Sequence, residues 1–229
     1  MSSHGEAAPS DQSDWRRYAV LGAVGSTFAG SILLMSPFVL MQLRSELPFM
    51  STPRYKVLKA LEFISQKQTK QVTRAKSPVL QSKRRRFYDL GSGDGEAVLA
   101  AAEAGWSATG IEMNPTLWLV SQIRRLWSPA EVRRRSRFVL GDMFQHGIHS
   151  ADAVMIFGVK PLMPRIAKKV STECKPGTCI LSYRFQLPTK DDSGENYGKL
   201  HAERIYDEEE MRVWQMNTFE SESEISTND

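Results

Sequence analysis

A short run of glycines and acids at residues 87–95 carries the strongest chemical signal in the sequence. It reads Phe-Tyr-Asp-Leu-Gly-Ser-Gly-Asp-Gly, and an apolar helical pattern begins at Glu96. Glycines let the backbone approach a ligand closely, and the first turn of a helix offers free N–H groups. A dinucleotide-binding turn uses the spacing G-x-G-x-x-G and needs no acid within it. Here the spacing is G-x-G-x-G, with Asp89 before it and Asp94 inside it.

These two carboxylates decide which class of ligand the turn suits. They would repel a diphosphate, but they would attract a nucleoside with a cationic amino-acid end. S-adenosylmethionine is the common nucleoside of that kind. The sequence therefore predicts an S-adenosylmethionine site in which Asp89, Gly91 and Gly93 bind the cofactor.

Further acids follow the next two predicted strands. Glu112 ends a strand at 107–111 and lies 17 positions after Gly95, close to the offset of about 20 residues expected for a carboxylate that binds ribose hydroxyls. Asn114, before Pro115, is expected to cap the next helix and is included among the cofactor-binding residues. Asp142 follows a strand at 137–140, and in methyltransferases an acid at this strand end commonly meets the adenine amino group.

The elements that must position these acids alternate between strand and helix. This rhythm predicts a parallel sheet with the ligand at the carboxyl ends of its strands. The expected fold is therefore α/β: a Rossmann-like class I methyltransferase fold with a mostly parallel seven-stranded sheet. The predicted strands lie at 87–89, 107–111, 137–140, 152–157 and 178–185, followed by a hairpin at 201–206 and 212–217.

Composition limits the other classes of site. The chain has 229 residues, enough for one ordinary domain with additions, and 41% of them are hydrophobic. Cys174 and Cys179 cannot build a disulfide framework or a metal cluster, and the four histidines form no metal-ligand pattern. No metal is therefore expected, and a reducing compartment is the default.

The N-terminal region predicts a membrane anchor. Residues 18–43 contain no charged side chain over 26 positions, whereas about 20 apolar residues span a bilayer. A buried helix or a cleavable signal peptide is the alternative, but no convincing cleavage site follows. The expected fold class therefore includes an N-terminal transmembrane helix. Basic residues are more numerous after this segment than before it, which favours a catalytic domain on the cytosol-like or matrix-like side of the membrane.

The rest of the chain divides by composition. Residues 1–17 and the acidic tail 218–229 are expected to be disordered. Residues 44–86 are expected to hold one amphipathic helix and then, from Lys67 to Arg86, a basic connector. Nucleic-acid binding, contact with anionic phospholipid and a solvated face remain open for this connector. Residues 87–217 are assigned to the methyltransferase domain.

Several motifs resemble those of one family. They are Ser36-Pro37-Phe38-Val39, Leu47-Pro48-Phe49, the Asp89–Gly95 turn, Glu112-Met113-Asn114-Pro115, Ile156-Phe157-Gly158-Val159 with Met163-Pro164, Tyr183-Arg184-Phe185 and Val213-Trp214. The sequence is similar to the membrane-tethered mitochondrial protein-lysine N-methyltransferases that modify the ATP synthase c-subunit and the adenine nucleotide translocase. It departs from their pattern at Ser51, where proline is usual, and at Glu96, where arginine is frequent.

The resemblance implies an S-adenosylmethionine-dependent enzyme that methylates a membrane-embedded protein substrate in the mitochondrial inner membrane. It implies that Phe157 and Gly158 position the acceptor and that Phe49, Thr52 and Tyr183 contact the substrate. No nucleic-acid partner and no general base are assigned.

Chemistry adds a requirement for an apolar acceptor site. A lysine amine must be neutral to attack the sulfonium methyl group, and desolvation lowers its pKa from about 10.4. Phe185 and Trp214, together with Phe49, Phe157 and Tyr183, could line such a channel, although ordinary core packing is the alternative for each.

Two other functions remain open from the sequence. The chain could methylate a small molecule or a lipid head group in the same membrane. It could also be a non-catalytic scaffold with a methyltransferase fold, although retention of Asp89, Glu112 and Asp142 argues against this. A nicotinamide oxidoreductase is disfavoured by the glycine spacing.

Overall fold

A computed structural model of the protein describes residues 14–44, 52–74, 85–157, 160–188, 190, 193–197 and 200–218. The chain divides into two compact units, Met1–Pro48 and Phe49–Asp229. Most of the ends that the sequence predicts to be disordered, 1–17 and 218–229, lie outside the described residues. Helix α1 begins at Asp14, however, and strand β7 ends at Thr218.

The described part of the first unit is one helix. Helix α1, Asp14–Arg44, is 31 residues long and includes the uncharged segment that the sequence predicts as an anchor. Large apolar side chains along it are exposed, among them Leu21, Val24, Phe28 and Leu33. A search of the described residues finds no helix that combines the length and the apolar character needed to cross a membrane.

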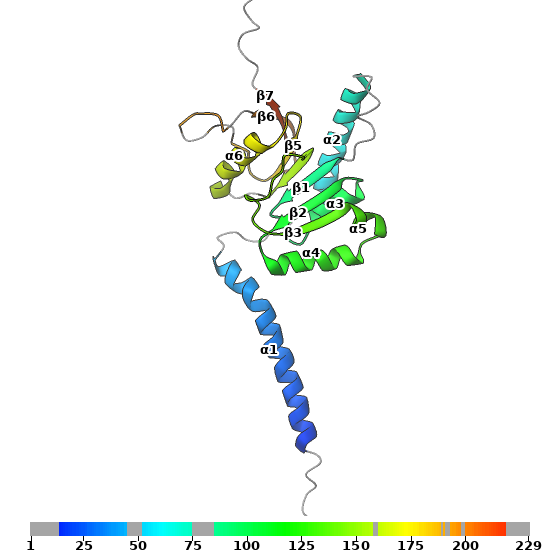
Figure 1. Ribbon diagram of the computed structural model, residues 1–229, viewed down its shortest axis with the longest axis vertical. Helices are drawn as coiled ribbons and strands as arrows, with labels where there is room; N and C mark the ends of the chain where they lie inside the picture. Colours follow the sequence, from blue (N-terminus) through cyan, green and yellow to red (C-terminus); the bar gives the residue numbers. More distant parts are fainter. Residues whose placement is uncertain are drawn as a thin grey trace, which may run out of the picture. The chain divides into compact units, whose positions relative to one another are not determined.

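The second unit is built on one seven-stranded sheet with the order β3-β2-β1-β4-β5-β7-β6 (Figure 1). The strands are β1 Arg86–Leu90, β2 Ser107–Glu112, β3 Ser136–Leu140, β4 Ala153–Ile156, β5 Cys179–Tyr183, β6 Leu200–Glu208 and β7 Met211–Thr218. The first five are parallel, and β7 joins β5 and β6 in antiparallel pairs. The predicted parallel sheet with a terminal hairpin is confirmed.

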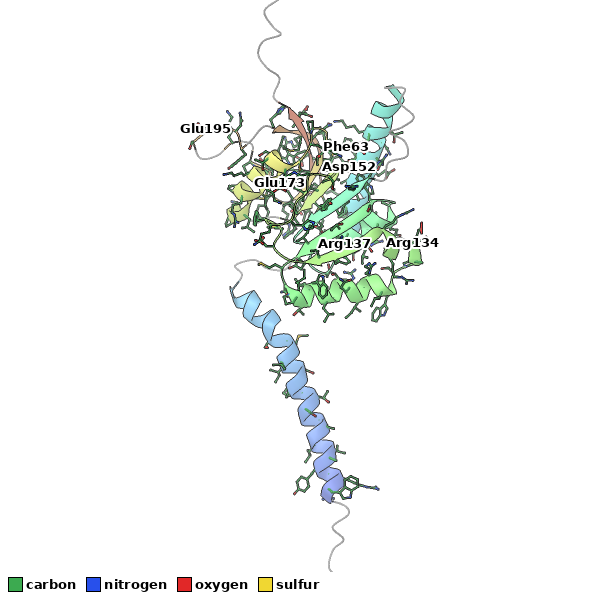
Figure 2. The ribbon with its side chains drawn as sticks, in the orientation of Figure 1. Phe63, Arg134, Arg137, Asp152, Glu173 and Glu195 are labelled. Atoms are coloured by element: carbon green, nitrogen blue, oxygen red, sulfur yellow. The ribbon has the colours of Figure 1, made fainter. Side chains whose placement is uncertain are left out.

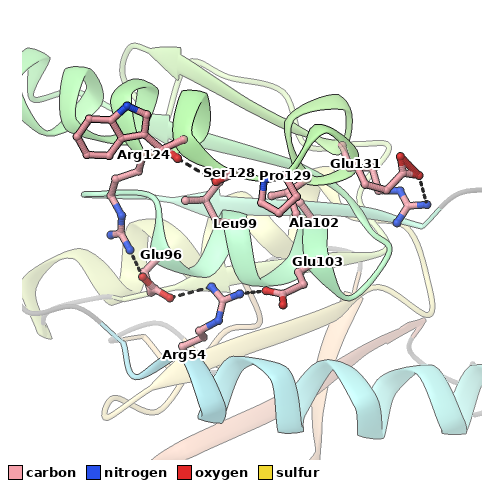
Figure 3. A pocket seen from close by; sticks show the side chains of 12 residues that line it. Arg54, Glu96, Leu99, Ala102, Glu103, Arg124, Ser128, Pro129 and Glu131 are labelled. Carbon is pink, nitrogen blue, oxygen red and sulfur yellow. Dashed lines mark hydrogen bonds and ion pairs between the residues drawn. The ribbon is translucent and has the colours of Figure 1, made fainter.

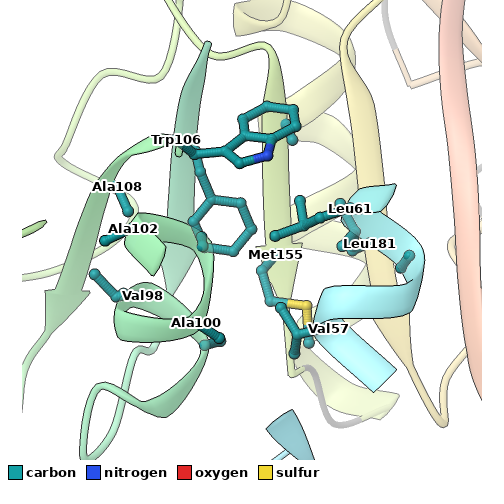
Figure 4. Packing of buried hydrophobic residues seen from close by; sticks show 14 of the residues in the cluster. Val57, Leu61, Val98, Ala100, Ala102, Trp106, Ala108, Met155 and Leu181 are labelled. Carbon is teal, nitrogen blue, oxygen red and sulfur yellow. The ribbon is translucent and has the colours of Figure 1, made fainter. Parts of the chain in front are cut away.

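Four helices pack on one face of this sheet: α2 Arg54–Arg74, α3 Glu96–Glu103, α4 Pro115–Trp127 and α5 Ala130–Arg135. Val57 and Leu61 of α2 are buried with Trp106 in a shared core (Figure 4). Full burial of an aliphatic side chain such as Leu61 contributes about 1.5–3 kcal/mol. The stripe of apolar residues that predicts α2 therefore attaches this helix to the sheet.

The opposite face is covered by α6, Met163–Glu173, which follows the short 3-10 helix η2, Lys160–Leu162. Ile166 and Val170 of α6 pack against strand residues that include Val154 and Ile180. Each strand of the sheet centre is buried on both sides, as expected for a parallel sheet with helices on both faces.

Helix α2 is longer than the sequence predicts. The predicted basic connector Lys67–Arg86 is wrong in its first part, because the helix continues through Arg74. The Lys67 side chain donates a hydrogen bond of 2.8 Å to the Gln215 side-chain oxygen on β7. The Phe63 ring of α2, labelled in Figure 2, lies tilted against the Tyr206 ring of β6, with ring centres 5.0 Å apart. These contacts hold α2 against the terminal hairpin.

Helix α5 is absent from the sequence prediction. It is six residues long and has three consecutive arginines in its last turn, so its apolar periodicity is too short to be recognised. Arg134 and Arg135 pair with Glu131 at helical spacing, and Val132 is buried. Arg134 stands at the outer end of this helix in Figure 2.

Candidate cofactor and acceptor site

The glycine turn lies between β1 and α3, where a parallel sheet binds ligands. The backbone N–H groups of Gly91 and Ser92 both donate to the carbonyl oxygen of Ile111, at 3.0 Å. Gly95 precedes α3 with φ 83°, and a Cβ atom there would lie 2.5 Å from the Phe138 ring. The turn therefore needs glycine at position 95 for both its backbone conformation and its packing.

Glu112, at the end of β2, is held by the turn that faces it. One carboxylate oxygen accepts a 2.7 Å hydrogen bond from the Gly93 N–H, and the other accepts a 2.8 Å bond from the Asn114 N–H. Each oxygen retains a second acceptor position. The carboxylate is therefore fixed in place and can still accept hydrogen bonds from the hydroxyls of a ribose.

Asn114 acts on the helix that follows it. Its side-chain oxygen accepts hydrogen bonds from Thr116 N at 2.9 Å and Leu117 N at 3.4 Å, so it caps the start of α4 as predicted. Its inclusion among the cofactor-binding residues stays a prediction.

Asp89 is a buried acid with an unusual environment. Its side chain lies within β1 and is 4% exposed. Burial raises its pKa to about 8, and the negative charges of Glu112 and Asp94 add to this effect. Among the described residues we find no hydrogen bond or ion pair to its carboxylate. A bound ammonium group would remove this penalty, so the residues present fit the cationic end of S-adenosylmethionine.

Asp94 does not share this role. The Arg124 guanidinium binds both Asp94 and Glu96, so the prediction that Asp94 attracts the cationic end of the cofactor is not supported. Burial alone would raise the pKa of Glu96, but hydrogen bonds from Arg54 and Arg124 outweigh it and lower that pKa. The glutamate that departs from the family pattern therefore belongs to an ion-pair network.

This network opens onto a pocket of about 720 Å³ between α2, α3, α4 and α5 (Figure 3). Arg54 bridges Glu96 and Glu103 on its rim. Leu99 and Ala102 contribute apolar surface to it. Asp89, Glu112 and Asp142 do not line this pocket, so it is separate from the predicted cofactor site.

Asp142 follows β3 at the same edge of the sheet. One of its carboxylate oxygens accepts a 2.8 Å hydrogen bond from Phe144 N, and the side chain is half-buried. Strand register places Asp89 opposite Gly110 and Glu112 opposite Leu140. The three acids predicted from the sequence therefore end three adjacent strands. Contact between Asp142 and adenine stays a prediction.

Two of the predicted acceptor residues, Phe157 and Tyr183, meet at the ends of β4 and β5. Phe157 follows β4, and its ring centre lies 5.7 Å from that of Tyr183, the last residue of β5. Thr52, just before α2, is 7% exposed. Gly158 and Phe49 lie outside the described residues. Their proposed roles, like those of Phe157 and Tyr183, stay predictions.

Two of the candidate aromatic residues lie away from the predicted acceptor site. Phe185 and Trp214 pack in the core on the α6 face of the sheet, beside Leu187. Phe157 and Tyr183 pack with the core on the α2 face. The four described aromatic side chains therefore do not line one channel, and core packing explains Phe185 and Trp214.

Sequence reasoning missed two residues of this region. Glu210, in the turn between β6 and β7, accepts a 3.0 Å hydrogen bond from the Tyr183 hydroxyl. A Cβ atom at Gly110 would lie 2.6 Å from the Ser92 hydroxyl oxygen. A glycine inside a strand pattern often marks such a close approach, so Gly110 could have been found, whereas Glu210 depends on tertiary contacts.

Comparison with known proteins agrees with this geometry. The family described as ANTKMT methyltransferase domain matches residues 89–193. The ATP synthase c-subunit lysine N-methyltransferase of Mus musculus is 32% identical over 185 residues, which are 80% of this chain and 67% of that protein. The Rattus norvegicus protein of the same name is 32% identical over 178 residues, 77% and 73% of the two chains.

Two further similarities extend this result. The adenine nucleotide translocase lysine N-methyltransferase of Mus musculus is 31% identical over 112 residues, 48% of each chain. An RNA methyltransferase from Salinibacter ruber, solved with S-adenosyl-L-homocysteine, superposes with a TM-score of 0.55 at 25% identity and covers 75% of this chain and 96% of that one. The fold, the strand-end acids and these similarities together show that the chain belongs to the family of S-adenosylmethionine-dependent protein-lysine N-methyltransferases that includes the enzymes named for the ATP synthase c-subunit.

Proposed function

We propose that the protein methylates a lysine on the matrix side of an integral protein of the mitochondrial inner membrane. The lead candidates are the ATP synthase c-subunit and the adenine nucleotide translocase. The observation that carries this proposal is the similarity over most of the chain to enzymes named for the first of these substrates, with shorter similarity to an enzyme named for the second.

Methyl transfer requires a bound cofactor, an apolar acceptor site and access to the substrate, and the described residues supply the first two. We assign Asp89 to the amino-acid end of the cofactor and Glu112 to its ribose. Phe157 and Tyr183 form an apolar, aromatic edge beside it, where desolvation favours the neutral amine. Positioning of donor and acceptor can contribute roughly 7–11 kcal/mol to such a reaction, and the methyl-transfer step itself needs no general base once the amine is neutral.

The third requirement is access to the substrate, which we assign to α1. We propose that α1 attaches the protein to the inner membrane with the catalytic unit in the matrix. Its uncharged segment 18–43 and the exposed apolar side chains along it support this proposal. Arg44, Arg54, Lys56 and Lys59 after this segment outnumber the two arginines before it, which favours the same orientation. Attachment to the substrate's own membrane raises the effective concentration of the acceptor.

The test is to delete the gene and measure lysine methylation on purified inner-membrane proteins by mass spectrometry. We expect methylation of one of the two candidates to disappear and to return with the wild-type gene. Asp89→Ala and deletion of residues 18–43 should each fail to restore it. Glu62→Ala should restore it fully, because Glu62 is an exposed acid on α2 whose carboxylate accepts a hydrogen bond from the Gln66 side chain of the same helix.

The same experiment separates the alternatives. Loss of methyl groups only from soluble proteins, lipids or metabolites would overturn the membrane-protein substrate but not the methyltransferase assignment. Full restoration by Asp89→Ala would instead favour the non-catalytic scaffold.

A further inference from the structure

Tyrosine rings and glutamate residues surround the side chain of Lys56, in the first turn of α2. Its Nζ atom is 5.1 Å from the centre of the Tyr183 ring and 5.9 Å from that of Tyr55. It donates a 2.6 Å hydrogen bond to the carbonyl oxygen of Glu209 and lies 3.8 Å from a carboxylate oxygen of Glu210. The Lys56 side chain is only 11% exposed. Rings beside a cation and an acid within reach form the kind of cage that recognises ammonium groups.

This cage adjoins Phe157, the residue proposed to position the acceptor. The Tyr183 ring contacts Lys56 on one side and the Phe157 ring, 5.7 Å away, on the other. Phe157 follows β4, and β4 pairs with β1 so that Met155 lies opposite Asp89. The Lys56 ammonium therefore lies at the end of the sheet where a lysine acceptor has to arrive.

The wall opposite α2 is a turn with unusual backbone angles. Glu209 and Glu210 have φ values of 49° and 70°, and Arg184, which faces them, has φ 66°. The Arg184 N–H donates a 2.8 Å hydrogen bond to the Glu210 carbonyl oxygen. Residues other than glycine adopt such angles at a cost, and they cluster at functional sites. This turn directs the Glu209 carbonyl and the Glu210 carboxylate towards Lys56.

Lys59 provides a comparison on the same helix. It also pairs with the hairpin, through Glu208, but its side chain is half exposed and no described aromatic ring lies over its ammonium group. The ring contacts are therefore a property of Lys56 and not of every lysine on this face of α2.

We propose that Lys56 occupies the acceptor-lysine position of its own active site and is itself methylated, as an internal substrate. This inference rests on the lysine methyltransferase function. The Lys56 ammonium first gives a proton to the Glu210 carboxylate, which passes it to solvent. The Nζ lone pair then attacks the sulfonium methyl group, the S–CH₃ bond breaks, a new N–CH₃ bond forms, and S-adenosylhomocysteine leaves. A protein substrate must displace Lys56 from the cage, so it competes with this reaction.

The test uses the full chain incubated with S-adenosylmethionine that carries a trideuterated methyl group. Peptide mass spectrometry should place the label on Lys56 and not on Lys59, at a rate that does not depend on protein concentration. Lys56→Arg should abolish the labelling, and Lys59→Arg should leave it unchanged. Glu210→Gln should slow it about tenfold, as expected for the weakening of an interaction with a charged group, while calorimetric affinity for the cofactor stays the same.

Each outcome decides the proposal. Label on Lys56 without methylation of added ATP synthase c-subunit or translocase would support the internal substrate and overturn the proposed protein substrates. Methylation of an added acceptor with no label on Lys56 would overturn the internal substrate and leave the proposed function intact. Label spread equally over Lys56, Lys59 and other lysines, or dependent on protein concentration, would also overturn it.

Discussion

The carboxylate of Glu112 accepts a 2.7 Å hydrogen bond from the backbone N–H of Gly93. This bond joins the end of β2 to the glycine turn after β1, so the acid predicted to bind the ribose and the turn predicted to hold the methionine end are held together. A change at Glu112 therefore affects the cofactor directly and through the shape of the turn.

Two substitutions of Glu112 should weaken cofactor binding to different degrees. Glu112→Gln keeps one acceptor oxygen and should have the smaller effect. Glu112→Ala removes every hydrogen bond of the carboxylate, each worth about 1.5–3 kcal/mol when it involves a charged group, so S-adenosylmethionine should bind roughly ten- to a hundredfold more weakly. Isothermal titration measures this, with circular dichroism as the control for folding. Wild-type affinity in a folded Glu112→Ala protein would contradict the site.

Cofactor affinity should depend on pH through Asp89. Burial, followed by the charges of Glu112 and Asp94, raises the pKa of Asp89 to about 8, and only the ionised form pairs with an ammonium group. Below pH 8 binding must therefore release a proton. Affinity should rise with pH between about 6 and 7.5, by up to about tenfold per pH unit. Asp89→Asn should bind more weakly and without this slope in the same titration.

The raised pKa of Asp89 also predicts how the folding stability of the cofactor-free protein depends on pH. The unfolded chain loses the Asp89 proton near its ordinary pKa of 3.8, whereas the folded chain keeps it up to about pH 8. Folding stability should therefore fall as pH rises between these values. Asp89→Asn should melt at a higher temperature than wild type at pH 7, and the two should converge below about pH 4. Equal melting temperatures at pH 7 would contradict the raised pKa of Asp89.

Gly95 and Gly91 form a matched pair for testing the turn. Both have positive φ, 83° and 84°, but an added Cβ meets the Phe138 ring at 2.5 Å from Gly95 and nothing within 4 Å from Gly91. Gly91→Ala should cost only the backbone strain, about 1–2 kcal/mol. Gly95→Ala should cost a further 1–3 kcal/mol or so for overpacking. Urea unfolding without cofactor measures both, and equal losses would contradict the packing.

Substitutions of Phe157 and of Phe185 distinguish a role at the proposed acceptor site from a role in the core. Phe157 contacts Tyr183 at the acceptor edge, whereas Phe185 packs on the opposite face of the sheet. Phe157→Leu should raise KM for the acceptor protein or lower kcat, with cofactor affinity unchanged. Phe185→Leu should lower the melting temperature and leave the kinetics of the folded protein unchanged. Identical kinetic effects of the two substitutions would contradict separate roles for Phe157 and Phe185.

The sequence predicts much of the cofactor site because the site depends on local order along the chain. A strand followed by a glycine turn and a helix determines where Asp89 lies. Glu112 and Asp142 likewise come at or just after the carboxyl ends of β2 and β3. Parallel strands bring their carboxyl ends to one edge, so the alternation of elements was enough to predict that these acids meet. Helix α5 was missed because six residues are too few for a periodic apolar pattern.

The acceptor region could not be derived in this way. Lys56, Tyr183 and Glu210 are far apart in sequence, and only the packing of α2 against the sheet and the β6–β7 turn brings them together. Phe157 and Tyr183 cannot be told from Phe185 and Trp214 by residue type, yet the two pairs pack in cores on opposite faces of the sheet. Sequence alone determined the fold and the cofactor, because both follow from local patterns. Tertiary structure decided which side chains surround the acceptor, because those contacts depend on how distant elements pack.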